Sequence, residues 1–254
     1  MQKNLNKTNQ IKIRDGVFRK MNIKVSLFNS TTEDLCIVID QLRATTTITL
    51  ALDSFNEVIP VNDIDKALSL KDENTLLAGE LDLKTIDGFD LTNSPHQIQQ
   101  NTADTLVLLT TNGTRVLENV KKKSEDTKVL VGSMINAHSV AKKALEMAND
   151  EIEIIMAGRR TNFNIEDALA AGIITQEIIN LAEKMKLDVH LDESAQAASI
   201  LSEDHNRSQQ LIYDSWGGCK LRKLGLEEDV KLCMKINHSE NVGIYEDAKI
   251  RLSK

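Results

Sequence analysis

The sequence predicts an α/β fold with three layers (α/β/α), a largely parallel sheet and a helical C-terminal third. Short apolar runs typical of buried strands, such as LVLL at 106–109, are followed by a polar loop and then by a helical pattern. Because a helix that crosses back over a sheet lets the next strand run parallel, repeated units of this kind favour a parallel sheet. From residue 184 onward the pattern is mainly helical.

The individual elements follow from these patterns in chain order. Strands are expected at 22–28, 35–40, 57–61, 75–78, 106–109, 129–131, 151–156 and 241–247. Helices are expected after the strands that end near residues 39, 61, 109, 131 and 156, and a long irregular loop follows residue 80. The last third is expected to hold two or three amphipathic helices broken near Gly217 and Gly218.

Composition and charge narrow the classes of function. The chain has 254 residues, 41% of them hydrophobic, which is enough for one domain over residues 21–254; the polar residues 1–20 are expected to be a poorly ordered extension. A net charge of −7 and 3% aromatic residues disfavour nucleic-acid binding. The apolar runs are too short for a membrane span and no secretory signal is visible, so a cytoplasmic location is expected. A homodimer is left open.

The cysteines indicate neither disulfides nor zinc. Cys36, Cys219 and Cys233 form an odd set without a CxxC motif. We expect them to be reduced packing residues.

The junction that follows the strand at 106–109 has the residues of an anion-binding site. Thr110, Thr111 and Thr114 supply hydroxyls, Gly113 lets backbone N–H groups approach a ligand, and the positive end of a helix begins there. Ordinary turn and helix-capping chemistry uses the same residue types, and that alternative stays open.

A second junction combines opposite charges. Asp40 ends a buried strand, and Arg43, Thr45 and Thr46 begin the next helix. Open α/β sheets bind their ligands at such places. The alternative is structural, with Asp40 capping the helix and pairing with Arg43.

Two further junctions and one loop complete the candidate site. Ser133 and Asn136 follow the strand at 129–131, and residues 157–160, with two arginines, follow the strand at 151–156. Asn93 and Ser94 stand on a Pro-containing turn in the long loop. In a parallel sheet these junctions lie on one edge and can converge on one pocket.

Seven segments of the chain stand out as a set. They are VIDQLRATTTI, GE, GFDLTNSP, TLVLLTTNGTRVL, VLVGSMINAHSVA, AGRRTNFNIEDALAAG and LRKLGLEEDVKLC. They run from about Val38 to Cys233 and resemble, in sequence and order, the 2-phosphosulfolactate phosphatase family. This resemblance implies an α/β/α protein and Mg²⁺-dependent hydrolysis of (R)-2-phospho-3-sulfolactate to 3-sulfolactate and phosphate, a step toward coenzyme M or sulfolactate.

The resemblance and the junctions together define the expected site around a small anionic phosphorylated substrate. The residues expected to be catalytic are Asp40, Arg43 and Asn112. The residues expected to bind substrate are Thr45, Thr46, Asn93, Ser94, Thr110, Thr111, Gly113, Thr114, Arg115, Ser133, Asn136, Gly158 and Arg159. The expected Mg²⁺ ligands are Asp40, Glu80 and Asp167. Arg115, Arg159 or Arg160 is expected to hold the acid groups of the substrate, and Asp40 is either a metal ligand or the nucleophile.

The chain departs from the family pattern at several positions. Gln41 replaces Val, Leu81 replaces Arg, Met156 replaces Cys, Arg159 replaces Thr and Trp216 replaces His. A cysteine nucleophile at 156 is therefore excluded. Two alternatives remain open: a phosphatase for a related phosphorylated hydroxy acid without a sulfonate, and a non-catalytic member that binds a small anion.

Overall fold

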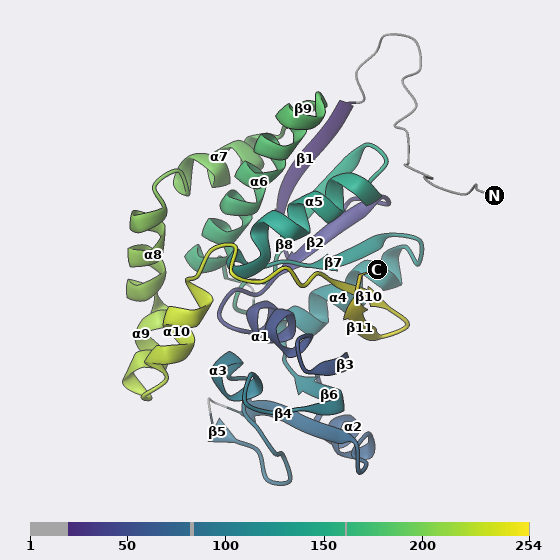
Figure 1. Cartoon of the computed structure of the whole chain (residues 1–254), viewed down its shortest axis with the longest axis vertical. Helices are drawn as coiled ribbons and strands as arrows, with labels where there is room; N and C mark the ends of the chain where they lie inside the picture. The colour runs from purple at the N-terminus through teal and green to yellow at the C-terminus, as the bar shows by residue number, and fades with distance from the viewer. Residues whose placement is uncertain (1–19, 82–83, 161, 254) are drawn as a thin grey trace, which may run out of the picture.

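The computed structural model describes residues 20–81, 84–160 and 162–253, and they form an α/β fold around one mixed sheet (Figure 1). The strands are β1 (Lys20–Leu27), β2 (Leu35–Ile39), β3 (Phe55–Val61), β4 (Thr75–Leu81), β5 (Lys84–Thr85), β6 (Ala103–Leu109), β7 (Lys128–Val131), β8 (Glu151–Met156), β9 (Asp188–Leu191), β10 (Gly243–Glu246) and β11 (Lys249–Leu252). The helices are α1 (Ala44–Ala51), α2 (Ile64–Ser69), α3 (Pro95–Ile98), α4 (Asn112–Lys123), α5 (Ala137–Met147), α6 (Ile165–Met185), α7 (Glu193–Leu201), α8 (His205–Asp214), α9 (Trp216–Lys223) and α10 (Glu227–Cys233), with a 3₁₀ turn, η1 (Met134–Asn136).

The sheet consists of two parallel groups joined by an antiparallel hairpin. Its order is β5-β4-β6-β3-β11-β10-β7-β2-β8-β1-β9. One group contains β4, β6 and β3, and the other contains β7, β2, β8, β1 and β9. Because three antiparallel pairings, through β10 and β11, separate β3 from β7, the two groups run in opposite directions through the hydrogen-bonded sheet. The predicted largely parallel sheet is confirmed. The expectation that all the junctions lie on one edge of this sheet was wrong, because the two groups run in opposite directions.

The ends of the two groups nevertheless meet, because α1 and α4 lie between them (Figure 1). One apolar cluster joins Val38 of β2 and Leu108 of β6 to Ile48 of α1 and Val116 of α4. Both groups therefore pack on the same pair of helices, and the residues after β2 and after β6 come together at the start of those helices.

The three layers are clearest around β2, whose five residues are all buried. Leu35, Ile37 and Ile39 share an apolar cluster with α5 and α6, whereas Cys36 and Val38 share the cluster that contains α1 and α4. Alternate side chains of a strand point to opposite faces, so helices cover both faces of this part of the sheet. The predicted α/β/α arrangement is thus confirmed.

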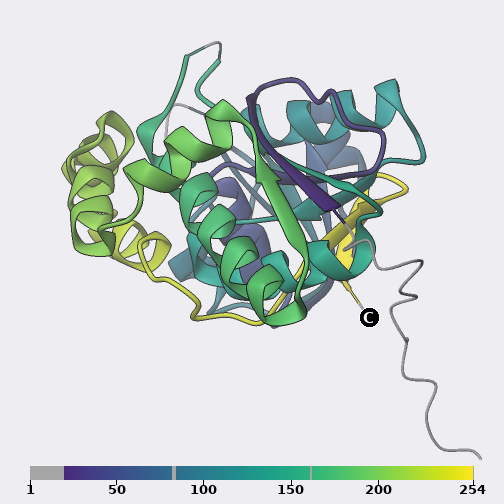
Figure 2. The same cartoon turned by 90° about the horizontal axis from the view of Figure 1, so that it is seen from above.

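The helical C-terminal third is also confirmed, with more elements than expected. The helices α8, α9 and α10 gather at one end of the molecule, on the left of Figure 1 and of Figure 2. The predicted break near Gly217 and Gly218 is confirmed, because α8 ends at Asp214 and α9 begins at Trp216. Both glycines lie in the first turn of α9, where Ser215 caps the helix by accepting the N–H of Gly218 at 3.0 Å. A Cβ on Gly218 would lie 2.3 Å from the carbonyl oxygen of Ile212, so glycine allows α8 and α9 to approach closely.

Three strands were not expected. Within the described part of the chain β9 pairs with β1 alone and has alternating exposed polar residues, and β5 contains two residues. The strand β11 follows a turn at Asp247 and Ala248, both with positive φ. Ala248 is not a usual residue for such a turn, so the sequence carries little hairpin signal.

Two further expectations concern membrane spans and the N-terminal extension. No helix in residues 20–81, 84–160 and 162–253 is long and apolar enough to cross a bilayer. The predicted extension at residues 1–20 lies outside the described residues, apart from Lys20, which begins β1.

Candidate active site

A pocket of about 170 Å³ opens where the chain leaves β2, β4 and β6. Its lining residues are Asp40, Leu42, Arg43, Glu80, Asn93, Leu109, Thr110, Thr111 and Asn112. Most of these were expected at the site from the sequence, and the pocket places them together although they come from both groups of strands.

Asp40 is held at the pocket by backbone contacts. Its Oδ2 accepts the N–H of Gly113 at 3.1 Å, so the first turn of α4 binds this carboxylate. The Thr45 hydroxyl donates to the Asp40 carbonyl at 3.0 Å and lies 3.1 Å from the Asp40 nitrogen, which fixes the turn. Burial raises the pKa of Asp40 from 3.8 to about 6, against the lowering effect of the Gly113 and Ala44 N–H groups.

Arg43 lies between two carboxylates. Its Nη2 is 2.5 Å from Glu80 Oε2, and its Nη1 pairs with Asp229 of α10. Burial alone would lower the pKa of Arg43, but Glu80 and Asp229 raise it above its usual value. Arg43 is therefore a fixed cation, 1% exposed at its side chain, with donors that remain for a ligand.

Asp229 is the functional residue that the sequence did not reveal. Besides Arg43, it accepts the Ser94 hydroxyl at 2.7 Å and the His96 N–H at 3.2 Å, both at Oδ1. It is the third of three consecutive acidic residues that begin α10, a pattern that usually only complements the helix dipole. The sequence feature that could have indicated its role is that it lies in LRKLGLEEDVKLC, one of the seven segments that resemble the family.

Two buried carboxylates stand behind the pocket. Asp167 accepts the N–H of Gln41 at 2.8 Å with Oδ1 and the N–H of Gly158 at 2.9 Å with Oδ2, and so joins the loops after β2 and β8. Burial, followed by the charges of Asp40 and Glu166, raises the pKa of Asp167 well above 3.8. Burial also raises the pKa of Glu166.

The residues expected to hold a metal are thus arranged differently from the expectation. Glu80 is paired with Arg43, and each Asp167 oxygen accepts a backbone N–H. Within the described ranges no three His, Cys, Asp or Glu side chains are grouped so as to hold a metal between them. Of the three expected ligands, Asp40 is the carboxylate that lines the pocket without an ion pair among the described residues.

Asn93 also lines the pocket. The residue is 7% exposed, and its Oδ1 has no hydrogen-bond partner among the described residues. An unpaired buried amide oxygen is costly unless a ligand pairs with it. The donor set at the pocket, Asp40 carboxylate and Asn93 amide oxygen, suits a hard cation such as Mg²⁺, which commonly uses one or two protein ligands together with water and phosphate oxygens.

The loop at 110–114 divides into residues that face the pocket and residues that support it. Thr110, Thr111 and Asn112 line the pocket, and Asn112 Oδ1 also accepts the N–H of Arg160 at 3.1 Å. The Gly113 N–H is used by Asp40, and the buried Thr114 hydroxyl donates to the Val61 carbonyl at 3.4 Å. Gly113 and Thr114 therefore position the site from behind it, and so does Thr46, whose hydroxyl donates to Gln41 O at 3.2 Å.

Several predicted substrate-binding residues do not reach the pocket. Ser133 and Asn136 are fully buried and form a capping box at η1, with the Ser133 N–H 2.9 Å from Asn136 Oδ1. The Arg115 guanidinium donates to the carbonyl of Arg160 at 2.7 Å and lies over the Phe28 ring. Gly158 turns the loop with φ +60°. Ser94 caps α3 and binds Asp229. We assign these residues structural roles in place of the expected substrate contacts.

Gln41, a departure from the family pattern, connects three segments through hydrogen bonds of its side chain. Its Nε2 donates to the carbonyl of Cys233 at 2.6 Å, and its Oε1 accepts the N–H of Met134 at 3.0 Å. The side chain is fully buried. Gln41 therefore connects the loop after β2 to both α10 and η1.

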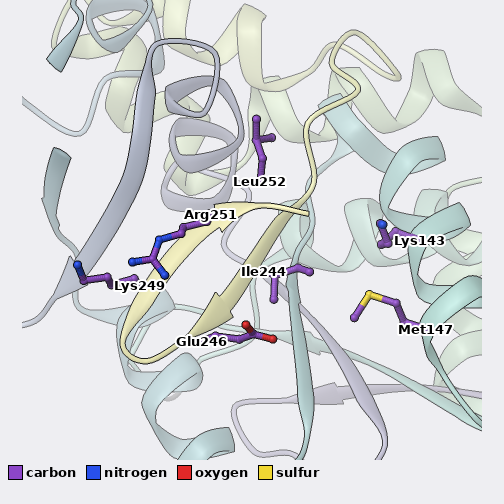
Figure 3. A pocket seen from close by; sticks show the side chains of 7 residues that line it. All are labelled: Lys143, Met147, Ile244, Glu246, Lys249, Arg251 and Leu252. Carbon is purple, nitrogen blue, oxygen red and sulfur yellow. The ribbon is translucent and has the colours of Figure 1, made fainter. Parts of the chain in front are cut away.

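A larger cavity, of about 460 Å³, lies elsewhere (Figure 3). Lys143 and Met147 line it from α5, and the β10–β11 hairpin lines the other side (Figure 3). Lys249 and Arg251 both pair with the single carboxylate of Glu57. None of the expected site residues lines this cavity.

Comparison with known proteins agrees with the resemblance seen in the sequence. The family model described as "2-phosphosulpholactate phosphatase" matches residues 22–248. The 2-phosphosulfolactate phosphatase of Methanothermobacter thermautotrophicus is 40% identical over 232 residues, which cover 91% of this chain and 96% of that protein. Proteins named probable 2-phosphosulfolactate phosphatase are 36% identical in Caldicellulosiruptor saccharolyticus (84% of this chain, 91% of that protein) and 34% identical in Clostridium beijerinckii (85% and 90%). The chain therefore belongs to the 2-phosphosulfolactate phosphatase family of phosphoric monoester hydrolases.

Proposed function

We propose that this protein is a Mg²⁺-dependent phosphatase that hydrolyses 2-phosphosulfolactate to 3-sulfolactate and phosphate in the cytoplasm, a step toward coenzyme M or sulfolactate. The proposal rests on the pocket that joins the ends of β2, β4 and β6. There a buried carboxylate, Asp40, and a buried cation, Arg43, stand beside the start of α4.

The balance of charge at the pocket supports the need for a divalent cation. Asp40, Glu80 and Asp229 face one cation, Arg43. The substrate itself carries roughly four negative charges near neutral pH. Such an anion would be repelled from this pocket on its own, and Mg²⁺ at Asp40 and Asn93 would reverse the sign of the local charge.

Each group of residues at the pocket would have a separate role in phosphoryl transfer. Bound Mg²⁺ would withdraw charge from the phosphoryl oxygens. The free N–H groups of Arg43, the hydroxyls of Thr110 and Thr111 and the amide of Asn112 would hold these oxygens and stabilise the charge that they carry in the transition state. Glu80 and Asp229 would keep the Arg43 guanidinium in one orientation.

Phosphate release from 2-phosphosulfolactate tests the proposed function. With Mg²⁺ the purified protein should release phosphate, and removal of metal by EDTA should lower the rate at least roughly 100-fold, with recovery when Mg²⁺ is added back. Binding of the substrate without any phosphate release would favour the non-catalytic alternative. Full activity after exhaustive metal removal would contradict the metal dependence.

The role of Asp229 gives a second prediction. Asp229→Asn removes one of the two carboxylates that orient Arg43, and we expect kcat/KM for phosphate release to fall roughly 10- to 100-fold. Glu228→Gln changes the adjacent residue, whose side chain is 67% exposed, and serves as the matched control. Unchanged kinetics of the Asp229 variant would remove α10 from the active site.

A further inference from the structure

Two of the departures from the family pattern lie against each other. The Arg159 guanidinium carbon lies 3.9 Å from the centroid of the Trp216 ring, and Lys220 Nζ lies 5.0 Å from the same centroid. Trp216 is 56% exposed. A guanidinium that stacks on an indole loses rotational freedom but keeps its N–H edges available to an anion.

This stacked pair lies beside the active-site pocket. Trp216 begins α9, and a Cβ on the next residue, Gly217, would lie 3.4 Å from Cδ1 of Leu42, a residue that lines the pocket. The loop that carries Arg159 is anchored to the pocket from the other side, because the Arg160 N–H donates to Asn112. The pair therefore joins two segments that border the pocket.

Arg159 differs from the other arginines near the pocket in two respects. Its guanidinium is held in one position, and it can still pair with an anion. Arg43 is paired with two carboxylates, and the Arg115 guanidinium donates to backbone carbonyls. Across the described residues no ion pair involves Arg159, although its charge acts on the nearby Glu166 carboxyl. Arg160 is exposed, and among the described residues no aromatic ring holds its guanidinium.

We infer that Arg159, held by Trp216, binds an acid group of the substrate other than the phosphate, either the sulfonate or the carboxylate. Arg159 thereby determines substrate specificity. This inference rests on the proposed function and deepens it. The pocket beside Asp40 takes the phosphoryl group, and a sulfonate or carboxylate on the same small molecule would extend toward the 157–160 loop. A planar guanidinium matches two oxygens of either acid group.

Matched variants and substrates separate this role from a structural one. We would measure kcat and KM for 2-phosphosulfolactate and for isopropyl phosphate, which keeps the phosphate ester but lacks both acid groups. In Arg159→Gln we expect KM for phosphosulfolactate to rise roughly 10- to 100-fold with kcat little changed, and values for isopropyl phosphate within about threefold of the wild type. Arg160→Gln, the matched control on the same loop, should leave both substrates within about threefold.

Trp216 is tested by keeping or removing the aromatic face. Trp216→Leu should raise KM for phosphosulfolactate roughly three- to tenfold, and Trp216→Phe, which keeps a ring, should restore most of the wild-type value. Equal losses for both substrates in Arg159→Gln, or no loss for either, would overturn the inference.

Binding of the product, 3-sulfolactate, keeps the inference separate from the proposed function. Calorimetry would compare 3-sulfolactate with inorganic phosphate for the wild type and for Arg159→Gln. Weaker binding of 3-sulfolactate alone supports the inference even if the wild type hydrolyses nothing, in which case only the proposed function fails. If neither hydrolysis nor binding of the sulfonate depends on residue 159, the inference is overturned.

Discussion

Asp40→Asn should lower turnover by several orders of magnitude while making the protein more stable at neutral pH. The carboxylate is the pocket's proposed metal ligand or nucleophile, and an amide serves poorly in either role. The amide oxygen of Asn can still accept the Gly113 N–H, so the start of α4 keeps its contact. Loss of phosphate release together with an unchanged circular dichroism spectrum is the expected result.

The stability change follows from the pKa of Asp40. Because burial raises this pKa to about 6, the folded protein binds a proton more tightly than the unfolded chain, and the wild type loses stability as pH rises from about 4 to about 6. Above pH 6 the buried charge destabilises the fold by roughly 1–3 kcal/mol, which the Asn variant avoids. Urea unfolding in metal-free buffer at pH 8 should therefore favour the variant, and the difference should disappear near pH 4.

Either half of this prediction can fail separately. Near-normal hydrolysis by Asp40→Asn would remove Asp40 from the mechanism. A variant that is less stable than the wild type at pH 8 would mean that the carboxylate has a compensating partner in the folded protein.

Arg43→Gln should lose both activity and stability. The change leaves Asp229 and Glu80, with side chains 2% and 16% exposed, without their cation. Removal of one partner from a buried ion pair commonly costs about 3–5 kcal/mol, and a phosphoryl contact is lost with it. We expect a large fall in the free energy of unfolding at pH 8 and a fall in kcat/KM of at least roughly 100-fold.

A double variant and a surface control distinguish this cause from a general loss of packing. Arg43→Gln with Asp229→Asn should regain part of the stability that Arg43→Gln loses, because one unpaired buried charge is removed. Lys231→Gln, which breaks exposed pairs with Glu227 and Glu228, should change stability by less than about 0.5 kcal/mol. Equal stability of Arg43→Gln and the wild type would contradict the buried network.

The sequence predicted the layers and much of the pocket because local patterns determine both. Buried strands and the polar residues that follow them are visible as short runs, so Asp40, Asn93 and Thr110 were all expected near one another. The hairpin of β10 and β11, which reverses half of the sheet, has a weak turn signal and pairs with strands far away in the chain. The direction of the two groups could not be deduced from local patterns.

The site residues that were misplaced have the same explanation. Ser133 and Asn136 have the composition of an anion-binding junction, but the same residues form a capping box, and only the fold shows which role they take. Asp229, in contrast, was not predicted although it contacts the site. Its partners, Arg43 and Ser94, lie more than a hundred residues earlier in the chain. Gln41 likewise binds α10 and η1 through contacts that no local pattern encodes.

A crystal soaked with Mg²⁺ and inorganic phosphate tests the central claim most directly. The account predicts metal density between the Asp40 carboxylate and the Asn93 amide oxygen, with phosphate beside Arg43 and the start of α4. Metal and phosphate bound together at another place, such as the cavity between α5 and the β10–β11 hairpin, with the pocket at Asp40 filled only by water, would contradict it.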